Sequence, residues 1–322
     1  MFYGGEKTRR DIFGSSVALA AAGLVASPTY AWAQGDDFSS EGQFKGRMTV
    51  PVSIAGGRPL RFMVDCAANS SVIAADLLAE TPHVVAGDLM MHTLIGAEIT
   101  PSVMVADFRS GGLAVARTRV AVGTREGLDG LDGLIGSELL ADKRILLNFG
   151  TRPQMRIQHA SGVGVGRRGR LGPATLLVAP TNRRFRDLVM IEALMGTAPA
   201  RAVIDSGADI SIINRAAAHA GRARPLTTLS GQTSANVQSP TGRSAVAELA
   251  LLPALNFNGF GVYRLPVLVG DFHVFERWGL ADRPTALLGV DVLSLFEMVA
   301  IDLHRREFSV QVGQRSSPIT AL

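Results

Sequence analysis

The feature that most constrains this sequence is an internal repeat. The segment AGGRPLRFMVDCAANSSVI, residues 55–73, aligns without gaps with MGTAPARAVIDSGADISII, residues 195–213, at a constant offset of 140 residues. Seven of the nineteen aligned positions are identical, and Asp65 is matched with Asp205. A chain that carries two copies of one unit is expected to fold as two related halves that pack against each other.

Each copy is followed by a second shared pattern, in which two apolar residues precede a glycine. The first half contains GLIGSELL at residues 133–140, and the second contains ALLGVDVL at residues 286–293. A weaker third correspondence pairs TLIG at residues 93–96 with TLSG at residues 228–231. The order of these patterns is the same in both halves, so the repeat extends well beyond its first segment.

Alternation of apolar and polar residues predicts mostly strands. RMTVPVSIAGGRPLRFMVD, residues 47–65, alternates around a Gly-Gly turn and predicts a hairpin. Short helices are expected at residues 74–79 and 214–219 and directly after Gly136 and Gly289. The sequence therefore predicts an all-β fold rather than an alternating βα fold. The expected segments are a first half at 45–158, a Gly/Arg linker at 159–173, a second half at 174–313 and a tail at 314–322.

The first 33 residues have the organisation of an export signal. Arg9 and Arg10 form a basic pair, a weakly apolar run covers residues 12–26, and Ala31-Trp32-Ala33 fits a cleavage pattern. The pair resembles a twin-arginine signal, while a Sec signal or an N-terminal anchor is the alternative. We expect a flexible segment at 34–44 and a periplasmic or secreted protein, with no membrane contact beyond an uncleaved signal anchor.

Composition narrows the possible partners. The net charge is +4, but the basic residues are spread along the chain, so no nucleic-acid partner is expected. Cys66 is the single cysteine, which excludes an intramolecular disulfide. His83 and His92 do not have the spacing of a metal-binding helix motif, and no metal or other cofactor is expected.

The repeated carboxylate indicates acid–base chemistry. Each half supplies one Asp at the end of an apolar strand, and a pseudo-twofold axis would bring Asp65 and Asp205 together. Two carboxylates that close share one proton. The ionised member can then activate a water molecule, and the protonated member can stabilise the oxyanion that forms. The alternative interpretation is that each Asp only caps the turn or helix that follows it.

The motifs VIDSGADISII and ALLGVDVL closely resemble those of retropepsin-like (retroviral-type) aspartic peptidases. The resemblance covers both halves and implies a bilobal fold with a cleft that binds an extended peptide or protein substrate beneath flap hairpins. By motif, Asp65 and Asp205 would be the catalytic pair, supported by Cys66, Ala67, Ser206 and Gly207. The resemblance places the candidate flaps at Ile95, Gly96, Ala97, Ser230, Gly231 and Gln232. Because both units lie in one chain, we expect a monomer.

The first half departs from this pattern at two positions. Cys66 stands where the family has Thr or Ser, and Ala67 stands where it has Gly. A thiol forms weaker hydrogen bonds than a hydroxyl group, and a methyl group occupies space where close backbone contact is wanted. Two hypotheses follow, an exported aspartic endopeptidase and a weak or inactive peptide-binding pseudoprotease. Cys66 as a nucleophile is disfavoured, because no motif supplies a basic partner.

Overall fold

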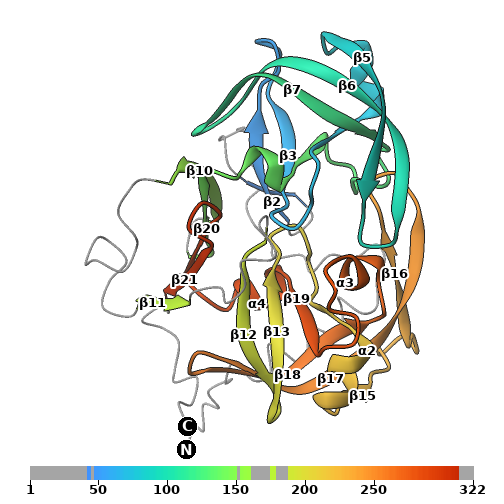
Figure 1. Cartoon of the computed structure of the whole chain (residues 1–322), viewed down its shortest axis with the longest axis vertical. Coiled ribbons are helices and arrows are strands. Elements are labelled where there is room, and N and C mark those ends of the chain that lie inside the picture. The colour runs from blue at the N-terminus through green and yellow to red at the C-terminus, as the bar shows by residue number, and fades with distance from the viewer. Residues whose placement is uncertain (1–41, 45–46, 151–152, 161–174, 179–187, 312–322) are drawn as a thin grey trace, which may run out of the picture.

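A computed structural model of the chain describes residues 42–44, 47–150, 153–160, 175–178 and 188–311. The predicted export signal, most of the segment at 34–44, nearly all of the predicted linker and the tail lie outside these residues. Among the described residues, no helix has the length and apolar character needed to cross a membrane. The first half lies at the top of Figure 1 and the second half below it, with a third sheet at the left.

The first half is built on an eight-stranded sheet with the order β1-β2-β3-β8-β4-β7-β6-β5. Its hairpin of β2 and β3 follows the prediction for residues 47–65, and the turn contains Gly56 at φ 73°. Gly42–Phe44 lie within the segment expected to be flexible, yet they pair with β2, an edge pairing too short for an alternation pattern to detect. The elements are β1 (Gly42–Phe44), β2 (Arg47–Val52), β3 (Leu60–Val64), β4 (Val72–Ala74), η1 (Ala75–Ala79), β5 (His83–His92), β6 (Ala97–Ser110), β7 (Leu113–Gly123), β8 (Gly133–Ile135) and η2 (Ser137–Leu139).

The second half repeats this topology in the sheet order β12-β13-β19-β14-β18-β17-β15, with β16 paired to β17. Strand β13 pairs parallel with β19, as β3 does with β8, and β14 pairs parallel with β18, as β4 does with β7. The two halves therefore share one fold, as the repeat predicted. The elements are β12 (Met190–Met195), β13 (Ala198–Ile204), β14 (Ile212–Ile213), α2 (Arg215–Ala220), β15 (Arg224–Pro225), β16 (Ser234–Gln238), β17 (Ser244–Phe257), β18 (Phe260–Val269), α3 (His273–Arg277), β19 (Thr285–Leu288) and α4 (Val290–Leu293).

The predicted short helices are all present. Helix η1 follows β4, and α2 follows β14. Helices η2 and α4 begin directly after Gly136 and Gly289. The all-β prediction is confirmed, and the helical segments serve as short connections at the ends of strands.

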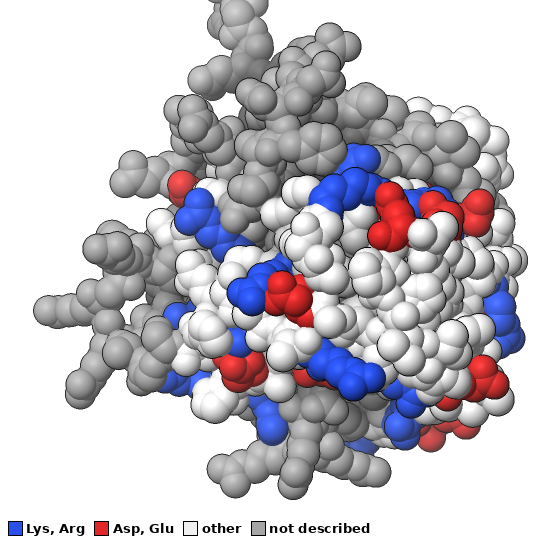
Figure 2. Space-filling view, turned by 90° about the horizontal axis from the view of Figure 1, so that it is seen from above, with Lys and Arg blue, Asp and Glu red and all other residues white. Residues whose placement is uncertain are grey.

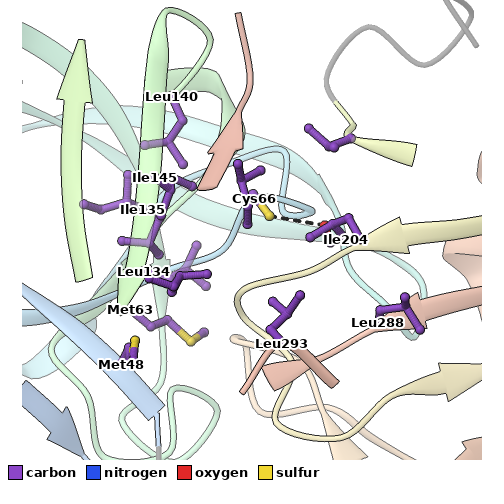
Figure 3. Packing of buried hydrophobic residues seen from close by; sticks show 14 of the residues in the cluster. Met48, Met63, Cys66, Leu134, Ile135, Leu140, Ile145, Ile204, Leu288 and Leu293 are labelled. Carbon is purple, nitrogen blue, oxygen red and sulfur yellow. Dashed lines mark hydrogen bonds between the residues drawn. The ribbon is translucent and has the colours of Figure 1, made fainter. Parts of the chain in front are cut away.

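A third sheet joins the halves in the order β10-β9-β20-β21-β11. Its strands are β9 (Lys143–Asn148), β10 (Gln154–His159), β11 (Thr175–Val178), β20 (Met298–Asp302) and β21 (Glu307–Gln311). Strand β9 of the first half pairs antiparallel with β20 of the second, and Arg144 forms a 2.7 Å ion pair with the buried Asp302. A continuous apolar core includes residues of both halves (Figure 3). The halves are thus fixed relative to each other.

Candidate active site

Two equivalent loops carry the repeated carboxylates to the contact between the halves. Asp65 follows β3, and its N–H donates a 2.9 Å hydrogen bond to the carbonyl of Ile135 in β8. Asp205 follows β13, and its N–H donates a 2.9 Å hydrogen bond to the carbonyl of Leu288 in β19. The loops approach so closely that a Cβ on Gly207 would lie 2.5 Å from the Cγ of Asp65. The structure therefore brings Asp65 and Asp205 together, and Gly207 must lack a side chain for this to happen.

The two carboxyl groups have different surroundings. Asp65 is half-buried, and its Oδ1 accepts hydrogen bonds from the N–H groups of Ala67 at 3.0 Å and Ala68 at 2.7 Å. Asp205 is 5% exposed, and its carboxyl group accepts hydrogen bonds from the N–H of Gly207 at 2.8 Å and from the N–H of Ala208. Burial, followed by the charge of Asp65, raises the pKa of Asp205 well above its ordinary value. Each carboxyl group accepts two backbone N–H groups, so burial is what distinguishes Asp205, because a buried carboxyl group favours its protonated form.

Cys66 and Ser206 connect the loops in a reciprocal way. The Ser206 hydroxyl donates to the carbonyl of Val64 at 2.7 Å and accepts from the N–H of Cys66 at 3.3 Å. The Cys66 thiol donates to the carbonyl of Ile204 at 3.2 Å and accepts from the N–H of Ser206 at 3.4 Å. Figure 3 shows the thiol pointing at Ile204 across the contact between the halves. The sulfur therefore forms both bonds of the network, although the sequence suggested that this connection would be weak.

The thiol of Cys66 is enclosed and protonated. The residue is 2% exposed, and burial, followed by the charge of Asp205, raises the pKa of the thiol to about 12. A thiol with this pKa keeps its proton at physiological pH, so it acts as a hydrogen-bond donor and not as a thiolate nucleophile. This agrees with the absence of a nucleophile motif in the sequence.

Two acidic residues near the loops were missed by the sequence analysis. The carboxylate of Glu138 accepts the N–H of Ser71 at 2.6 Å, and that of Asp291 accepts the N–H of Ser211 at 2.9 Å. Both acids occupy the second position after the glycine in GLIGSELL and ALLGVDVL. The coincidence of an acid at this position in both halves was the available signal.

The candidate flap residues of the first half lie at a hairpin tip. Ile95 and Gly96 belong to the turn between β5 and β6, closed by a 2.9 Å hydrogen bond from the N–H of Thr93 to the carbonyl of Gly96. Ala97 begins β6. The structure thus places these residues at a hairpin tip, and their role as a flap stays a prediction.

In the second half, the expected correspondence is wrong. Ser230, Gly231 and Gln232 lie in a turn between β15 and β16, where Gly231 has φ 81°. The counterpart of the β5–β6 hairpin is formed by β16 and β17, whose tip covers residues 239–243. A Thr-Leu-x-Gly turn needs only a local glycine conformation, so the pattern could not distinguish between two turns of one connection.

The tips of the β5–β6 and β16–β17 hairpins are joined by hydrogen bonds between the two halves. Glu98 of β6 accepts hydrogen bonds from Thr93 at 2.8 Å, from Ser239 at 3.3 Å and from Thr241. His92 at the end of β5 stacks on His273 of α3 with ring centroids 5.4 Å apart, and a nitrogen of one ring lies 3.1 Å from a nitrogen of the other. Figure 1 shows β5 and β6 reaching down beside β16 and α3.

Two further features are the grouping of possible metal ligands and the distribution of charged side chains. Within the described ranges, no group of three or more His, Cys, Asp or Glu side chains could hold a metal ion. On the face shown in Figure 2, the described acidic and basic side chains lie interspersed and form no patch of one sign.

Comparisons with known proteins agree with this geometry. A family model described as aspartyl protease matches residues 50–139 and 190–292, which include both Asp loops and both glycine patterns. The crystal structure of an aspartic proteinase from Irpex lacteus is similar, with a TM-score of 0.55 and 12% identity, over 85% of this chain and 96% of that one. At this identity the likeness concerns the fold. No curated protein matches the sequence.

Proposed function

This chain belongs to the aspartyl protease family, and from this premise we propose that it is an exported endopeptidase whose catalytic pair is Asp65 and Asp205. The observation that carries the proposal is the contact between the two carboxyl groups, one enclosed with a raised pKa and one held by two backbone N–H groups. If Asp65 and Asp205 only capped the turns that follow them, their carboxyl groups would have no need to lie against each other.

The roles follow from the different surroundings of the two groups. The ionised Asp65 takes a proton from a water molecule, and the water oxygen forms a bond to the carbon of a peptide carbonyl. The carbonyl π electrons move to oxygen, where the protonated Asp205 donates a hydrogen bond to the developing oxyanion. The C–N bond then breaks as the leaving nitrogen receives the proton that Asp65 took from the water molecule. One proton on the pair is required, so the rate should fall when the pair gains or loses a proton.

The contacts of the two residues that depart from the family motif, Cys66 and Ala67, favour an active enzyme over an inactive one. The Cys66 thiol takes part in both cross-connections, and the N–H of Ala67 still reaches Asp65 at 3.0 Å. The methyl group of Ala67 packs against an apolar cluster of the second half. The competing function, a peptide-binding pseudoprotease, would use the same cleft without turnover.

The deciding experiment is cleavage of a diverse peptide library by the mature protein from acidic to neutral pH. Asp65→Asn and Asp205→Asn are each expected to abolish cleavage, and a pepstatin-type inhibitor is expected to block it. A folded wild-type protein that cleaves nothing at any pH would favour the pseudoprotease. Cleavage that persists in either Asn variant would exclude the two-carboxylate mechanism.

Export and oligomeric state are separate parts of the proposal. We propose delivery to the periplasm or exterior through the signal at residues 1–33, supported by its Arg9-Arg10 pair. Cell fractionation of an Arg9→Lys/Arg10→Lys variant tests this, with retained export arguing against a twin-arginine route. Sedimentation tests the proposed monomer, for which the β9–β20 pairing within one chain is the support.

A further inference from the structure

Each catalytic loop is anchored at its far end by the same set of hydrogen bonds. In the first half, the N–H of Gly136 donates to the hydroxyl of Ser71 at 2.9 Å. The N–H of Ser71 donates to the carboxylate of Glu138 at 2.6 Å. The N–H of Ser137 reaches back to the carbonyl of Ala68 at 2.8 Å. The loop that begins at Asp65 is thus closed onto the start of η2.

The second half repeats every one of these bonds. The N–H of Gly289 donates to the hydroxyl of Ser211 at 3.1 Å, and the N–H of Val290 donates to the carbonyl of Ala208 at 2.8 Å. Asp291 accepts both the N–H of Ser211 at 2.9 Å and its hydroxyl at 2.7 Å. The loop that begins at Asp205 is closed onto the start of α4 in the same way.

The acids do not contact the place where a peptide would react, but they act on the loops that carry the reacting groups. We propose that Asp291 and Glu138 are positioning residues, which fix the ends of the two loops and thereby the placement of Asp205 and Asp65 relative to each other. The proposal rests on the proposed function insofar as it concerns catalysis. The anchoring itself is a property of the folded chain.

A carboxylate suits this position because it accepts several hydrogen bonds at once. The two oxygens of Asp291 receive the N–H and hydroxyl of Ser211 and the N–H of Val292 at 2.9 Å. An amide would place an NH2 group against one of these donors, and alanine would leave all of them without this acceptor. Glu138 performs the same task with a longer side chain, so the protein itself indicates that Asp and Glu are both suitable.

The central variant is Asp291→Asn, measured in the full mature chain. We expect kcat to fall by about 10- to 100-fold while KM changes little, because a small misplacement of a reacting group lowers the rate without removing substrate contacts. Asp291→Glu should recover most of kcat. Glu138→Gln and Glu138→Asp form the matched pair in the first half and should behave in the same way.

Loss of fold must be separated from loss of position. Asp302→Asn is the matched control, because it removes a carboxylate from the Arg144 ion pair in the third sheet without touching either loop. It should lower the melting temperature but leave kcat per folded molecule unchanged. Amide hydrogen exchange of residues 205–211 gives a second readout, and these amides should exchange faster in Asp291→Asn than in the control.

The readouts distinguish failure of the inference from failure of the proposed function. Faster exchange at 205–211 together with a lower kcat that Asp291→Glu restores supports the positioning role. Faster local exchange in a protein whose wild type cleaves nothing supports the anchoring and overturns the proposed function. Unchanged exchange at 205–211 and unchanged kcat in Asp291→Asn would overturn the inference.

Discussion

Replacement of Cys66 by alanine tests whether the thiol truly connects the halves. In the native protein its sulfur donates to the carbonyl of Ile204 and accepts from the N–H of Ser206, at a position that is 2% exposed. Alanine removes the sulfur and leaves both backbone groups without this partner. Serine keeps a donor and acceptor in nearly the same place, so the two variants differ mainly in the hydrogen bonds.

The expected cost follows from the burial of the two backbone groups. A buried polar group that loses its partner costs about 1–3 kcal/mol. Two such groups, offset by partial relaxation of the loops, give a loss of about 2–4 kcal/mol for Cys66→Ala. This corresponds to a melting temperature lower by about 4–16 °C, since 1 kcal/mol shifts a domain of this size by roughly 2–4 °C. Cys66→Ser should stay within about 1 kcal/mol of the native protein.

Chemical denaturation monitored by circular dichroism measures these differences, with thermal melts as a second method. Ser206→Ala is the matched variant from the second half, because its hydroxyl has the same two roles toward Val64 and Cys66. It should cost at least as much as Cys66→Ala, since its bond to Val64 is short. If Cys66→Ala is as stable as the native protein, the thiol contributes only volume and the reasoning fails.

Three further predictions concern other contacts of the site. Gly207→Ala places a Cβ 2.5 Å from the Cγ of Asp65, and peptidase assays should show at least about a 100-fold loss of kcat/KM. The pKa of His92 is lowered by burial, by Arg277 and by His273, so its stabilising contribution is complete above the unfolded pKa of about 6.5 and is lost below it. His92→Gln should therefore show a smaller fall in melting temperature on mild acidification, and an equal fall would exclude this role. The buried Asn214 caps α2, and its NH2 group lies within hydrogen-bonding distance of three carbonyls, so Asn214→Ala should cost about 2–4 kcal/mol in denaturant titrations. Asn214→Asp should keep only the bonds that Oδ1 accepts from Ala217 and Thr285.

The sequence was sufficient for the parts of the fold that are encoded by the repeat. Matching of residues 55–73 with 195–213 predicted two related halves, and alternation predicted the β2–β3 hairpin. These features depend on local pattern and on one comparison of the chain with itself. The pairing of β9 with β20 was not predicted, because it joins segments of opposite halves and neither strand's sequence indicates which strand it pairs with.

The site was predictable in outline but not in its supporting contacts. Asp65 and Asp205 follow from the repeat, whereas the bond from Ser71 to Glu138 spans 67 residues and that from Ser211 to Asp291 spans 80. The weaker bonding expected of the Cys66 thiol stays a prediction. Its partners Ile204 and Ser206 could not be predicted, because only the folded chain defines their positions.

The two carboxyl groups lie at equivalent positions of the repeat but differ in their surroundings. Gly207 has no side chain, and Asp65 occupies the space that a Cβ would need. The equivalent Ala67 keeps its methyl group, which packs on apolar residues of the second half. Burial, followed by the charge of Asp65, raises the pKa of Asp205, whereas Asp65 stays half-buried. The two carboxyl groups are therefore distinguished by burial, although the sequence repeat makes them equivalent.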